Sequence, residues 1–211
     1  MNINLDDTNA RLNVELPEIR IRSEISIEEA LNKRRSIRDY QERPVSLAQV
    51  GQLLWAAQGI TDPVRGRRAA PSAGARYPLE FYLAVNNVTG LDVGVYHYDP
   101  GKHQLKTKMA NNRVKDLALA ARQDWIAQAA GVIVISAVYQ RTTDRYGDRG
   151  LQYVHMDVGI AAENVYLQAE ALGLGTVFVG AFVDDELHSH MQLSKSEQPL
   201  CLLPVGWPLS H

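Results

Sequence analysis

Apolar residues recur at helical spacing in two short stretches near the N-terminus. The first stretch runs from Ile27 into Arg34, and the second runs from Leu47 to a stop at Gly59. Ser26 and Ser46 each precede a stretch and stand three residues ahead of a Glu or Gln. This is the pattern of a capping box, which satisfies free amides at the start of a helix. We therefore predict two capped helices, with the arginines at the C-terminal turn of the first.

Helical spacing returns at residues 114–121, 153–172 and 184–191. The stretch at 153–172 is apolar almost all round, which predicts a buried core helix. Small residues near its middle would let another helix approach closely. These residues are Gly159, Ala161 and Ala162. We expect this helix to form the core and to contribute to a contact between subunits.

Short apolar runs and strict alternation predict the strands. They are expected at 80–85, 93–98, 104–106, 132–135, 176–179 and 202–205. Asp99-Pro100-Gly101 predicts a hairpin turn between the second and third of these strands. The run at 132–135 is apolar throughout and should be central and buried on both faces. Residues 1–25 alternate around Pro17, which favours an extended arm or edge strand, of a kind that often lies on a partner subunit.

Helices and strands are intermixed along the chain, with no internal repeat and no linker that would divide it. The predicted class is α+β, with a mixed central sheet flanked by helices. We predict an extended arm at residues 1–25 and one domain at residues 26–211. A chain of 211 residues is long enough to bury a substantial core as a single domain.

Composition excludes several classes of protein. Hydrophobic residues make up 45% of the chain and charged residues 22%, so the disordered and fibrous classes do not apply. A formal net charge of −2 argues against nucleic acid as a partner, and we interpret the basic clusters at 65–68 and 102–108 as solvated loops. No stretch reaches the roughly 18 apolar residues of a membrane-spanning helix, so no membrane partner is expected.

The single cysteine and the first residues bear on the compartment. Cys201 cannot form an intramolecular disulfide and lies in an apolar run, so we expect a buried thiol and a reducing compartment. The N-terminus has neither the basic nor the apolar region of a signal peptide. We therefore expect a cytoplasmic protein.

The sequence lacks the familiar motifs of metal sites, dinucleotide-binding turns, hydrolases and nucleotide-triphosphatases. His188-Ser189-His190 lacks the spacing and the carboxylate of a zinc site, so no metal is expected. Gly173-Leu174-Gly175 follows a helix and precedes a strand, the reverse of the dinucleotide-binding order, which predicts a helix C-cap instead. Hydrolase and nucleotide-triphosphatase functions are disfavoured, because neither a Gly-x-Ser-x-Gly elbow nor a Walker sequence occurs.

Three guanidinium groups and a hydroxyl fall within five residues, at Arg34, Arg35, Ser36 and Arg38. We call these residues the arginine motif. Fork-shaped donors suit the oxygens of a phosphate or carboxylate, so the motif is a candidate site for an anionic cofactor. Taken alone, it could equally be a charged turn exposed to solvent.

A second candidate lies in the segment from Thr61 to Pro78, which is long for a connection and rich in Gly, Ala, Pro and Arg. Within it, Ser72 offers a hydroxyl and Arg76 a cation. Small residues at Ala73 and Gly74 let backbone amides approach a flat ligand. A third segment, which we call the glycine segment, follows at residues 173–182.

Together, the three segments resemble the FMN-dependent nitroreductase superfamily. The resemblance extends from about residue 26 to Pro208, in the right order. The sequence Pro-Ser-Ala-Gly-x-x-Tyr-Pro at 71–78 is most similar to the azoline-oxidase-like (SagB-type) dehydrogenases. The resemblance implies a nitroreductase-like fold and a homodimer with FMN at the subunit interface.

The resemblance also implies roles for single residues. Arg34 and Arg35 would lie at the FMN phosphate and Arg38 at the pyrimidine edge, while residues 71–74 would reach the flavin from the other subunit. Amides of the third segment would face flavin N5. The implied cofactor-binding residues are Arg34, Arg35, Ser36, Arg38, Pro71, Ser72, Ala73, Gly74, Arg76, Gln123, Val179, Gly180 and Ala181. Many nitroreductases carry a basic pair near the C-terminus, whereas residues 206–211 have none, so the phosphate should rely on Arg34, Arg35 or Arg76.

The implied function is an FMN-dependent oxidoreductase. It would pass a hydride from NAD(P)H through FMN N5 to an organic acceptor, such as a nitro compound or quinone, in a ping-pong cycle. No catalytic side chain is expected, because the flavin carries the chemistry. One alternative is an FMN-dependent dehydrogenase or oxidase of a peptide-derived heterocycle or other organic substrate, without NAD(P)H. Another is a flavin-binding protein without catalytic activity.

Overall fold

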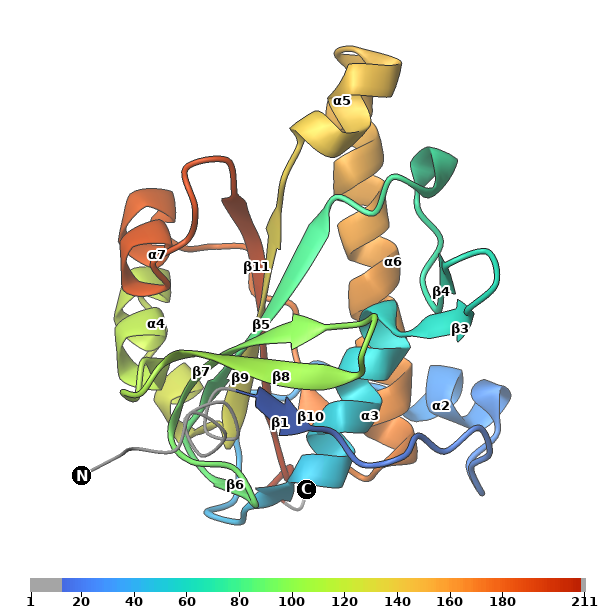
Figure 1. The fold of residues 1–211 in the computed structure, drawn as a ribbon. Helices are drawn as coiled ribbons and strands as arrows, with labels where there is room; N and C mark the ends of the chain where they lie inside the picture. The colour runs from blue at the N-terminus through green and yellow to red at the C-terminus, as the bar shows by residue number, and fades with distance from the viewer. Residues whose placement is uncertain (1–12, 210–211) are drawn as a thin grey trace, which may run out of the picture.

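A seven-stranded sheet forms the centre of the protein in the computed structural model, which describes residues 13–209 (Figure 1). The strand order is β1-β8-β7-β5-β9-β11-β10. The strands are β1 (Asn13–Glu15), β5 (Leu79–Val85), β7 (Gly94–Asp99), β8 (Gln104–Met109), β9 (Gly131–Ala137), β10 (Gly175–Thr176) and β11 (Gln198–Gly206). Every pairing between these strands is antiparallel.

The α+β class is therefore confirmed, but the prediction of a mixed sheet was wrong for the named strands of this sheet. Within the described residues, parallel pairing occurs between β2 (Val45–Ser46) and β6 (Val88–Thr89) and at an isolated bridge between Ser36 and Thr176. The apolar run in β9 reports burial on both faces and carries no information on strand direction.

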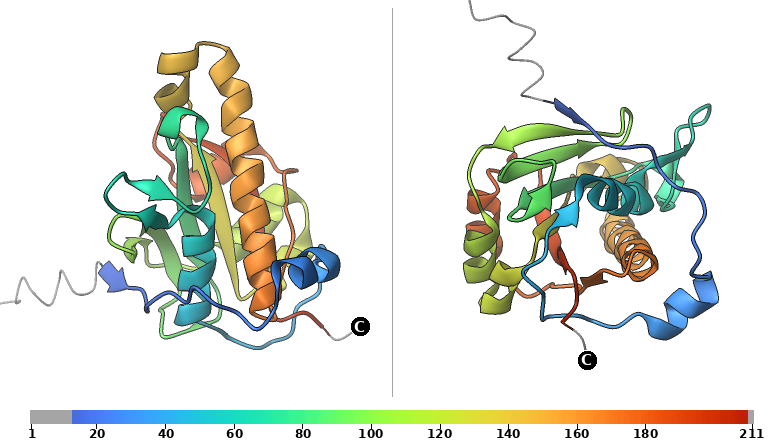
Figure 2. Two further views of the ribbon diagram at one scale, coloured as in Figure 1. Left: turned by 90° about the vertical axis from the view of Figure 1, so that its right-hand side faces the viewer. Right: turned by 90° about the horizontal axis from the view of Figure 1, so that it is seen from below.

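Helices cover both faces of the sheet (Figure 2). Helices α3 (Leu47–Gln58) and α6 (Arg149–Ala171) pack on one face, and α4 (Val114–Ala121) and α7 (Asp184–His190) pack on the other. Alternate residues of β5 serve the two layers. Phe81 belongs to the core beneath α3 and α6, whereas Tyr82 belongs to the core beneath α4 and α7.

The remaining elements lie around these layers. They are α2 (Ile27–Lys33), β3 (Ile60–Asp62), β4 (Arg67–Arg68), η1 (Ala73–Ala75), η2 (Asp124–Gln128) and α5 (Gln140–Tyr146). Both predicted capping boxes are present, Ser26 with Glu29 and Ser46 with Gln49. Helix α5 and the first turns of α6 project beyond the end of the sheet (Figure 1).

The described part of the N-terminal arm packs on its own chain. Strand β1 pairs with β8, and Leu16 is buried in the core. Farther along, the Gln52 side chain accepts a hydrogen bond from Arg20 N–H and donates one to Arg20 O, both at 2.9 Å. The predicted edge strand is therefore present at residues 13–15, and residues 1–12 of the predicted arm lie outside the described residues.

Two predicted elements differ in detail. Helix α6 begins at Arg149 and is not apolar all round, because its outer face exposes polar residues together with Met156 and Ile160. The strand predicted at 176–179 ends at Thr176. In the register that joins Thr176 to Val205 and Val179 to Leu202, Val177 faces Pro204, which has no N–H to donate to the ladder. Phe178 N–H faces the outer edge and donates to the hydroxyl of Tyr166 on α6.

Candidate functional site

The arginine motif begins where α2 ends, and the edge of the sheet beside β10 fixes its course. Ser36 pairs with Thr176 in a parallel bridge, and Ile37 N–H donates to Thr176 O at 3.0 Å. Gly175 permits this approach, because a Cβ at that position would lie 2.7 Å from the Ile37 side chain. The motif is thus an ordered segment of the sheet edge that keeps its polar side chains toward solvent.

The three guanidinium groups of the motif have no carboxylate partner within residues 13–209. Arg34 lies 5.3 Å from the centroid of the Tyr166 ring. Arg35 donates from Nη1 to the carbonyls of Asn32 at 3.0 Å and Arg34 at 2.7 Å. Arg38 is exposed. Guanidinium groups without a carboxylate are free to bind an anion, so this donor set fits a phosphate.

Tyr166 links the motif to the segment after β10. Its hydroxyl accepts a hydrogen bond from Phe178 N–H at 2.7 Å and lies 3.2 Å from Ser36 Oγ. Because the phenol oxygen already accepts from Phe178, its own proton is available to Ser36 Oγ. The Ser36 hydroxyl proton can then be donated to a ligand. The sequence did not single out Tyr166, since a tyrosine in an amphipathic helix carries no signal of its partners.

One of the three amide donors predicted in the segment after β10 is used within the protein. Val179 N–H donates to Leu202 O, and Leu202 N–H donates to Val179 O, both at 2.9 Å. The prediction that Val179 offers its amide to the cofactor was therefore wrong. Gly180 and Ala181 are exposed at the surface. They remain predicted donors.

Gln123 is half-buried directly before η2. Its backbone N–H donates to Ala118 O at 3.0 Å. Its contact with the pyrimidine stays a prediction.

The loop at 71–77, which we call the proline-serine loop, lies against α6 at a different level. Ser72 Oγ donates to Asp157 Oδ2 at 2.6 Å, and Ala73 N–H donates to Asp157 Oδ1 at 3.4 Å. Tyr77 N–H donates to Ser72 Oγ at 2.9 Å. Pro71 and Gly74 are exposed. The hydroxyl of Ser72, predicted to serve the cofactor, is thus already engaged as a donor within the protein.

Arg141 of α5 fixes the end of this loop. Its guanidinium pairs with Glu80 and donates to Tyr77 O at 3.1 Å, and its carbonyl accepts from Arg76 Nε at 2.6 Å. Burial alone would raise the pKa of Glu80, but the hydrogen bond from His97 and the charge of Arg141 outweigh it and hold that pKa below its usual range. Arg76 is therefore tied to α5, and one chain does not bring it to the arginine motif.

The two halves of the predicted site meet α6 on different turns. Asp157 holds the proline-serine loop and Tyr166 holds the arginine motif, nine positions apart. At about 1.5 Å per residue, this separation is roughly 14 Å along the helix axis. A single chain therefore brings the arginine motif and the glycine segment together at Tyr166, and it keeps the proline-serine loop apart.

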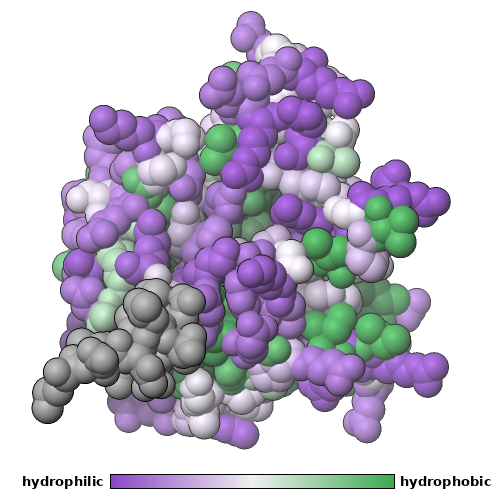
Figure 3. All heavy atoms as spheres, viewed as in Figure 1, coloured by the Kyte–Doolittle hydropathy of each residue, from purple (hydrophilic) through white to green (hydrophobic). Residues whose placement is uncertain are grey.

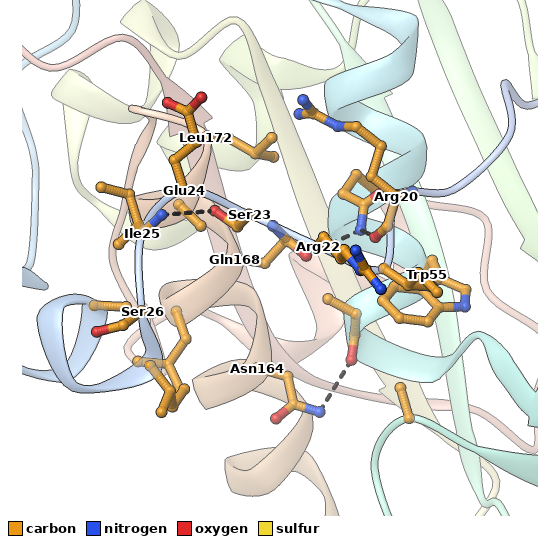
Figure 4. A pocket seen from close by; sticks show the side chains of 18 residues that line it. Arg20, Arg22, Ser23, Glu24, Ile25, Ser26, Trp55, Asn164, Gln168 and Leu172 are labelled. Atoms are coloured by element: carbon orange, nitrogen blue, oxygen red, sulfur yellow. Dashed lines mark hydrogen bonds between the residues drawn. The ribbon is translucent and has the colours of Figure 1, made fainter.

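A groove of about 870 Å³ lies beside α2, lined by residues 20–27, α3 and α6 (Figure 4). Gln52 Nε2 donates to Gln168 Oε1 across it at 3.0 Å, and Asn164 donates to Ala56 O at 3.0 Å. None of the predicted cofactor residues lines this groove. Figure 3 shows apolar side chains gathered on this side of the molecule, where Ile21, Ile27 and Leu31 are exposed.

The basic cluster at 65–68 has partners inside the protein. Arg65 pairs with Asp62 at 3.3 Å. Arg68 donates to Gln58 Oε1 at 3.0 Å and lies 4.3 Å from the centroid of the Tyr77 ring. Arg67 and Arg68 form β4, which pairs with β3, so the interpretation of this cluster as a solvated loop was wrong for these two residues.

Other chemistry is sparse in the part of the chain that the structure describes. Within residues 13–209, no three His, Cys, Asp or Glu side chains gather as metal ligands would. In the same range, no helix has the length and apolar character needed to cross a bilayer. Cys201 is fully buried, as predicted, and burial raises the pKa of its thiol.

Comparisons with known proteins agree with this fold. The chain is 48% identical over 196 residues to the protein named "Putative nitroreductase MJ1384" of Methanocaldococcus jannaschii, covering 92% of this chain and 96% of that protein. A crystal structure of a protein named "putative nitroreductase" from Ralstonia eutropha JMP134 is 30% identical, with a TM-score of 0.84 and coverage of 94% of this chain and 90% of that one.

Two further relatives are more distant. The FMN reductase (NAD(P)H) of Bacillus subtilis is 28% identical over 193 residues, covering 85% of this chain and 64% of that protein. The microcin B17-processing protein McbC of Escherichia coli is 25% identical over 158 residues, covering 72% of this chain and 58% of that protein. The chain thus spans less than two thirds of these two relatives. The model described as "Nitroreductase family" matches residues 31–207, so this chain is an oxidoreductase of the nitroreductase family.

Proposed function

We propose that this protein binds FMN between the arginine motif of one chain and the proline-serine loop of a second copy. The observation that carries the proposal is the group of three guanidiniums that have no carboxylate partner among residues 13–209 and lie beside the Ser36 hydroxyl, which Tyr166 orients. These donors suit a phosphate and the electron-accepting edge of an isoalloxazine. Exposed Gly180 and Ala181 offer the backbone face for the ring.

The positions of the two halves of the site on α6 support the proposal of a second copy. Between the two halves of the site, the helix exposes a stripe formed by Met156, Gly159, Ile160 and Glu163. A Cβ at Gly159 would meet nothing within 4 Å, so the surface there is open to a partner. Two copies of α6 packed antiparallel along this stripe would bring the loop of each chain within about one helical turn of the arginine motif of the other.

The proposed reaction takes a hydride from NAD(P)H and delivers it to an organic acceptor, such as a nitro compound or quinone, in a ping-pong cycle. The Bacillus subtilis relative, named as an FMN reductase that uses NAD(P)H, supports this choice of donor. Bound FMN would supply the redox chemistry. The protein needs no proton-abstracting side chain for it.

The roles of the protein residues follow from their positions. Arg34 and Arg35 would hold the phosphate, and Ser36 would donate to it through the proton that Tyr166 leaves free. Arg38 would place a positive charge at the pyrimidine edge, where negative charge collects when the ring is reduced. Such a cation raises the reduction potential. The fully buried thiol of Cys201 suits the reducing cytoplasm that we propose as the compartment.

Anaerobic mixing with NADH and NADPH tests the reaction. Bound FMN is expected to lose its visible absorbance with at least one nicotinamide and to regain it when a quinone or nitroaromatic is added. FMN that stays oxidised with both nicotinamides would overturn the NAD(P)H step.

A second candidate is a dehydrogenase of a peptide-derived heterocycle that does not use NAD(P)H. The similarity to McbC, named as a microcin B17-processing protein, favours it. In that case bound FMN would remain oxidised with both nicotinamides and lose its absorbance with thiazoline- or oxazoline-containing peptides. The mixing experiment therefore separates the two candidates. FMN that neither kind of substrate reduces would instead indicate a flavin-binding protein without activity.

A further inference from the structure

We propose that Asp157 is a positioning residue that clamps the proline-serine loop in the shape that faces the flavin. The proposal rests on the proposed FMN site for its functional consequence. The clamp itself is a property of this chain and can be measured without cofactor.

Asp157 is a buried carboxylate whose partners both come from the loop. It is 4% exposed, on the helix that lies in the centre of the proposed dimer interface. It accepts from Ser72 Oγ at 2.6 Å and from Ala73 N–H at 3.4 Å. None of the ion pairs within residues 13–209 involves it. A buried charge without a cation depends on its hydrogen-bond donors, so helix and loop are coupled.

Ser72 links Asp157 to the other end of the loop through two hydrogen bonds. A hydroxyl has one proton and two lone pairs. Ser72 gives its proton to Asp157 and uses one lone pair to accept Tyr77 N–H at 2.9 Å. The two ends of the loop are thereby joined through one side chain. Ser72 cannot also donate to a ligand, so its contribution to binding is the shape of the loop.

The backbone of the loop needs such a clamp. Ala75 and Tyr77 have φ values of 53° and 47°, and Gly74 between Ala73 and Ala75 has φ of 59°. Left-handed conformations are unfavourable for residues with a Cβ, and they persist where surrounding contacts hold them. Gly74 also faces the hydroxyl of Tyr146, and the Cβ of any other residue there would clash with it.

Two effects on the pKa of Asp157 oppose each other. Burial raises the pKa of Asp157, and the hydrogen bonds from Ser72 and Ala73 offset that effect only in part. Because the folded-state pKa is raised, the folded protein binds more protons than the unfolded chain between the two pKa values, and stability falls as pH rises through that window. Above that window the ionised carboxylate therefore lowers the stability of the folded protein.

The test combines amide exchange, thermal unfolding and FMN binding. Asp157→Ala and Ser72→Ala remove the clamp. Asp157→Asn keeps one oxygen to accept from Ser72 but loses the second carboxylate oxygen, which accepts from Ala73 N–H. Asp185→Asn, an exposed carboxylate on α7, is the matched control. In cofactor-free protein, loss of one such hydrogen bond should speed exchange of the Tyr77 amide about tenfold in Asp157→Ala and Ser72→Ala. Asp157→Asn should restore most of that protection.

FMN affinity should fall about tenfold in Asp157→Ala and by an intermediate amount in Asp157→Asn. The unfolding midpoint of Asp157→Asn at neutral pH should equal or exceed that of the unaltered protein, since a buried charge is removed. Weaker FMN binding without lower stability distinguishes a positioning role from a structural one.

Two results would overturn the inference. Unchanged exchange at Tyr77 in both clamp variants would mean that Asp157 does not hold the loop. Faster exchange with unchanged FMN affinity would mean that the loop shape does not serve the flavin. If the unaltered protein binds no FMN, the proposed function fails and the exchange data still decide the clamp.

Discussion

Two serines in the candidate site have opposite hydrogen-bonding states. Ser72 Oγ donates its proton to Asp157. Ser36 Oγ lies where it can accept the proton of the Tyr166 hydroxyl, so its own proton stays available. A hydroxyl has a single proton to give, so Ser36 can act as a donor to an anion and Ser72 cannot. The two residues look alike in sequence, and their partners on α6 decide what each can do.

Arg34→Ala tests the phosphate contact. Removing a charge-assisted hydrogen bond should weaken FMN binding by about 1.5–3 kcal/mol. Fluorescence titration of the apoprotein with FMN measures this change. Lys102→Ala, an exposed cation in the turn between β7 and β8, should leave the affinity unchanged and controls for net charge. Equal affinities of Arg34→Ala and the unaltered protein would mean that the phosphate lies elsewhere.

Tyr166→Phe tests the link between the motif and the glycine segment. The change removes the acceptor of Phe178 N–H and the partner of Ser36 Oγ while keeping the ring beneath Arg34. We expect a loss of about 1 kcal/mol in the free energy of unfolding and weaker FMN binding. Denaturant unfolding and FMN titration measure the two effects. Ser36→Ala should weaken FMN binding without the loss of stability.

The sequence predicts the site residues that stand together in compact motifs. It does not predict residues whose hydrogen-bond partners lie far away in the chain. The arginine motif could be predicted because three guanidiniums within five residues have a chemical meaning before any folding. Asp157 and Tyr166 could not, since each is a single polar residue in a helix whose loop partners lie far away in the chain. The prediction for the Val179 amide was wrong for a related reason, because this amide donates to Leu202 O on β11.

Among the elements, α6 organises the site. It carries both positioning side chains and, between them, the exposed stripe proposed for the partner. The capping boxes gave correct starts for α2 and α3 because the signal is local. The strand expected at 176–179 was too long because Pro204, which faces Val177 on β11, has no N–H to donate. Tertiary partners thus decided what local propensity could not.

Ile160→Glu tests the proposed dimer. Ile160 is 41% exposed and Met156 53% exposed on the stripe, so a charge at 160 costs the single chain little. Facing itself across a twofold axis, the same charge should favour the monomer. Sedimentation velocity should show a dimer for the unaltered protein and a monomer with weakened FMN binding for the variant.

Leu119→Glu on α4 is the matched control for this experiment. Leu119 is 57% exposed on the opposite face of the sheet and should tolerate the charge without change in assembly. A monomeric unaltered protein that binds FMN tightly would contradict the proposed interface. So would an Ile160→Glu variant that remains dimeric.

At the scale of the whole molecule, the antiparallel sheet is stabilised at one end by a buried acidic residue. Glu197 is 8% exposed and accepts hydrogen bonds from Tyr82 and Ser136 at 2.7 Å and from Ser194 at 2.9 Å. Burial alone would raise the pKa of Glu197, but these hydrogen bonds outweigh it and lower that pKa. The carboxylate joins β5, β9 and the segment that leads into β11.

Glu197→Gln should change how stability depends on pH. With a lowered folded-state pKa, Glu197 contributes its full stability above the unfolded value of about 4.3, and the contribution is lost as pH falls through the folded value. The variant should therefore be less stable by about 1–2 kcal/mol at pH 7, with the difference shrinking below about pH 4. Denaturant unfolding between these pH values measures it. A difference that does not change with pH would contradict this role.

The fold class followed from the alternation of helices and strands, whereas the direction of the strands and the assembly of the site did not. An apolar strand such as β9 is buried on both faces in either kind of sheet, so direction depends on the connections. The proposed site includes a second chain, and the contacts between two chains cannot be worked out from the hydrophobic pattern of one.

Equilibrium titration of the purified apoprotein with FMN, followed by absorbance near the flavin bands and by quenching of flavin fluorescence, tests the proposed FMN site. We expect saturable binding of one FMN for each chain, with two per dimer. A protein that stays colourless and leaves the FMN spectrum unchanged would contradict it.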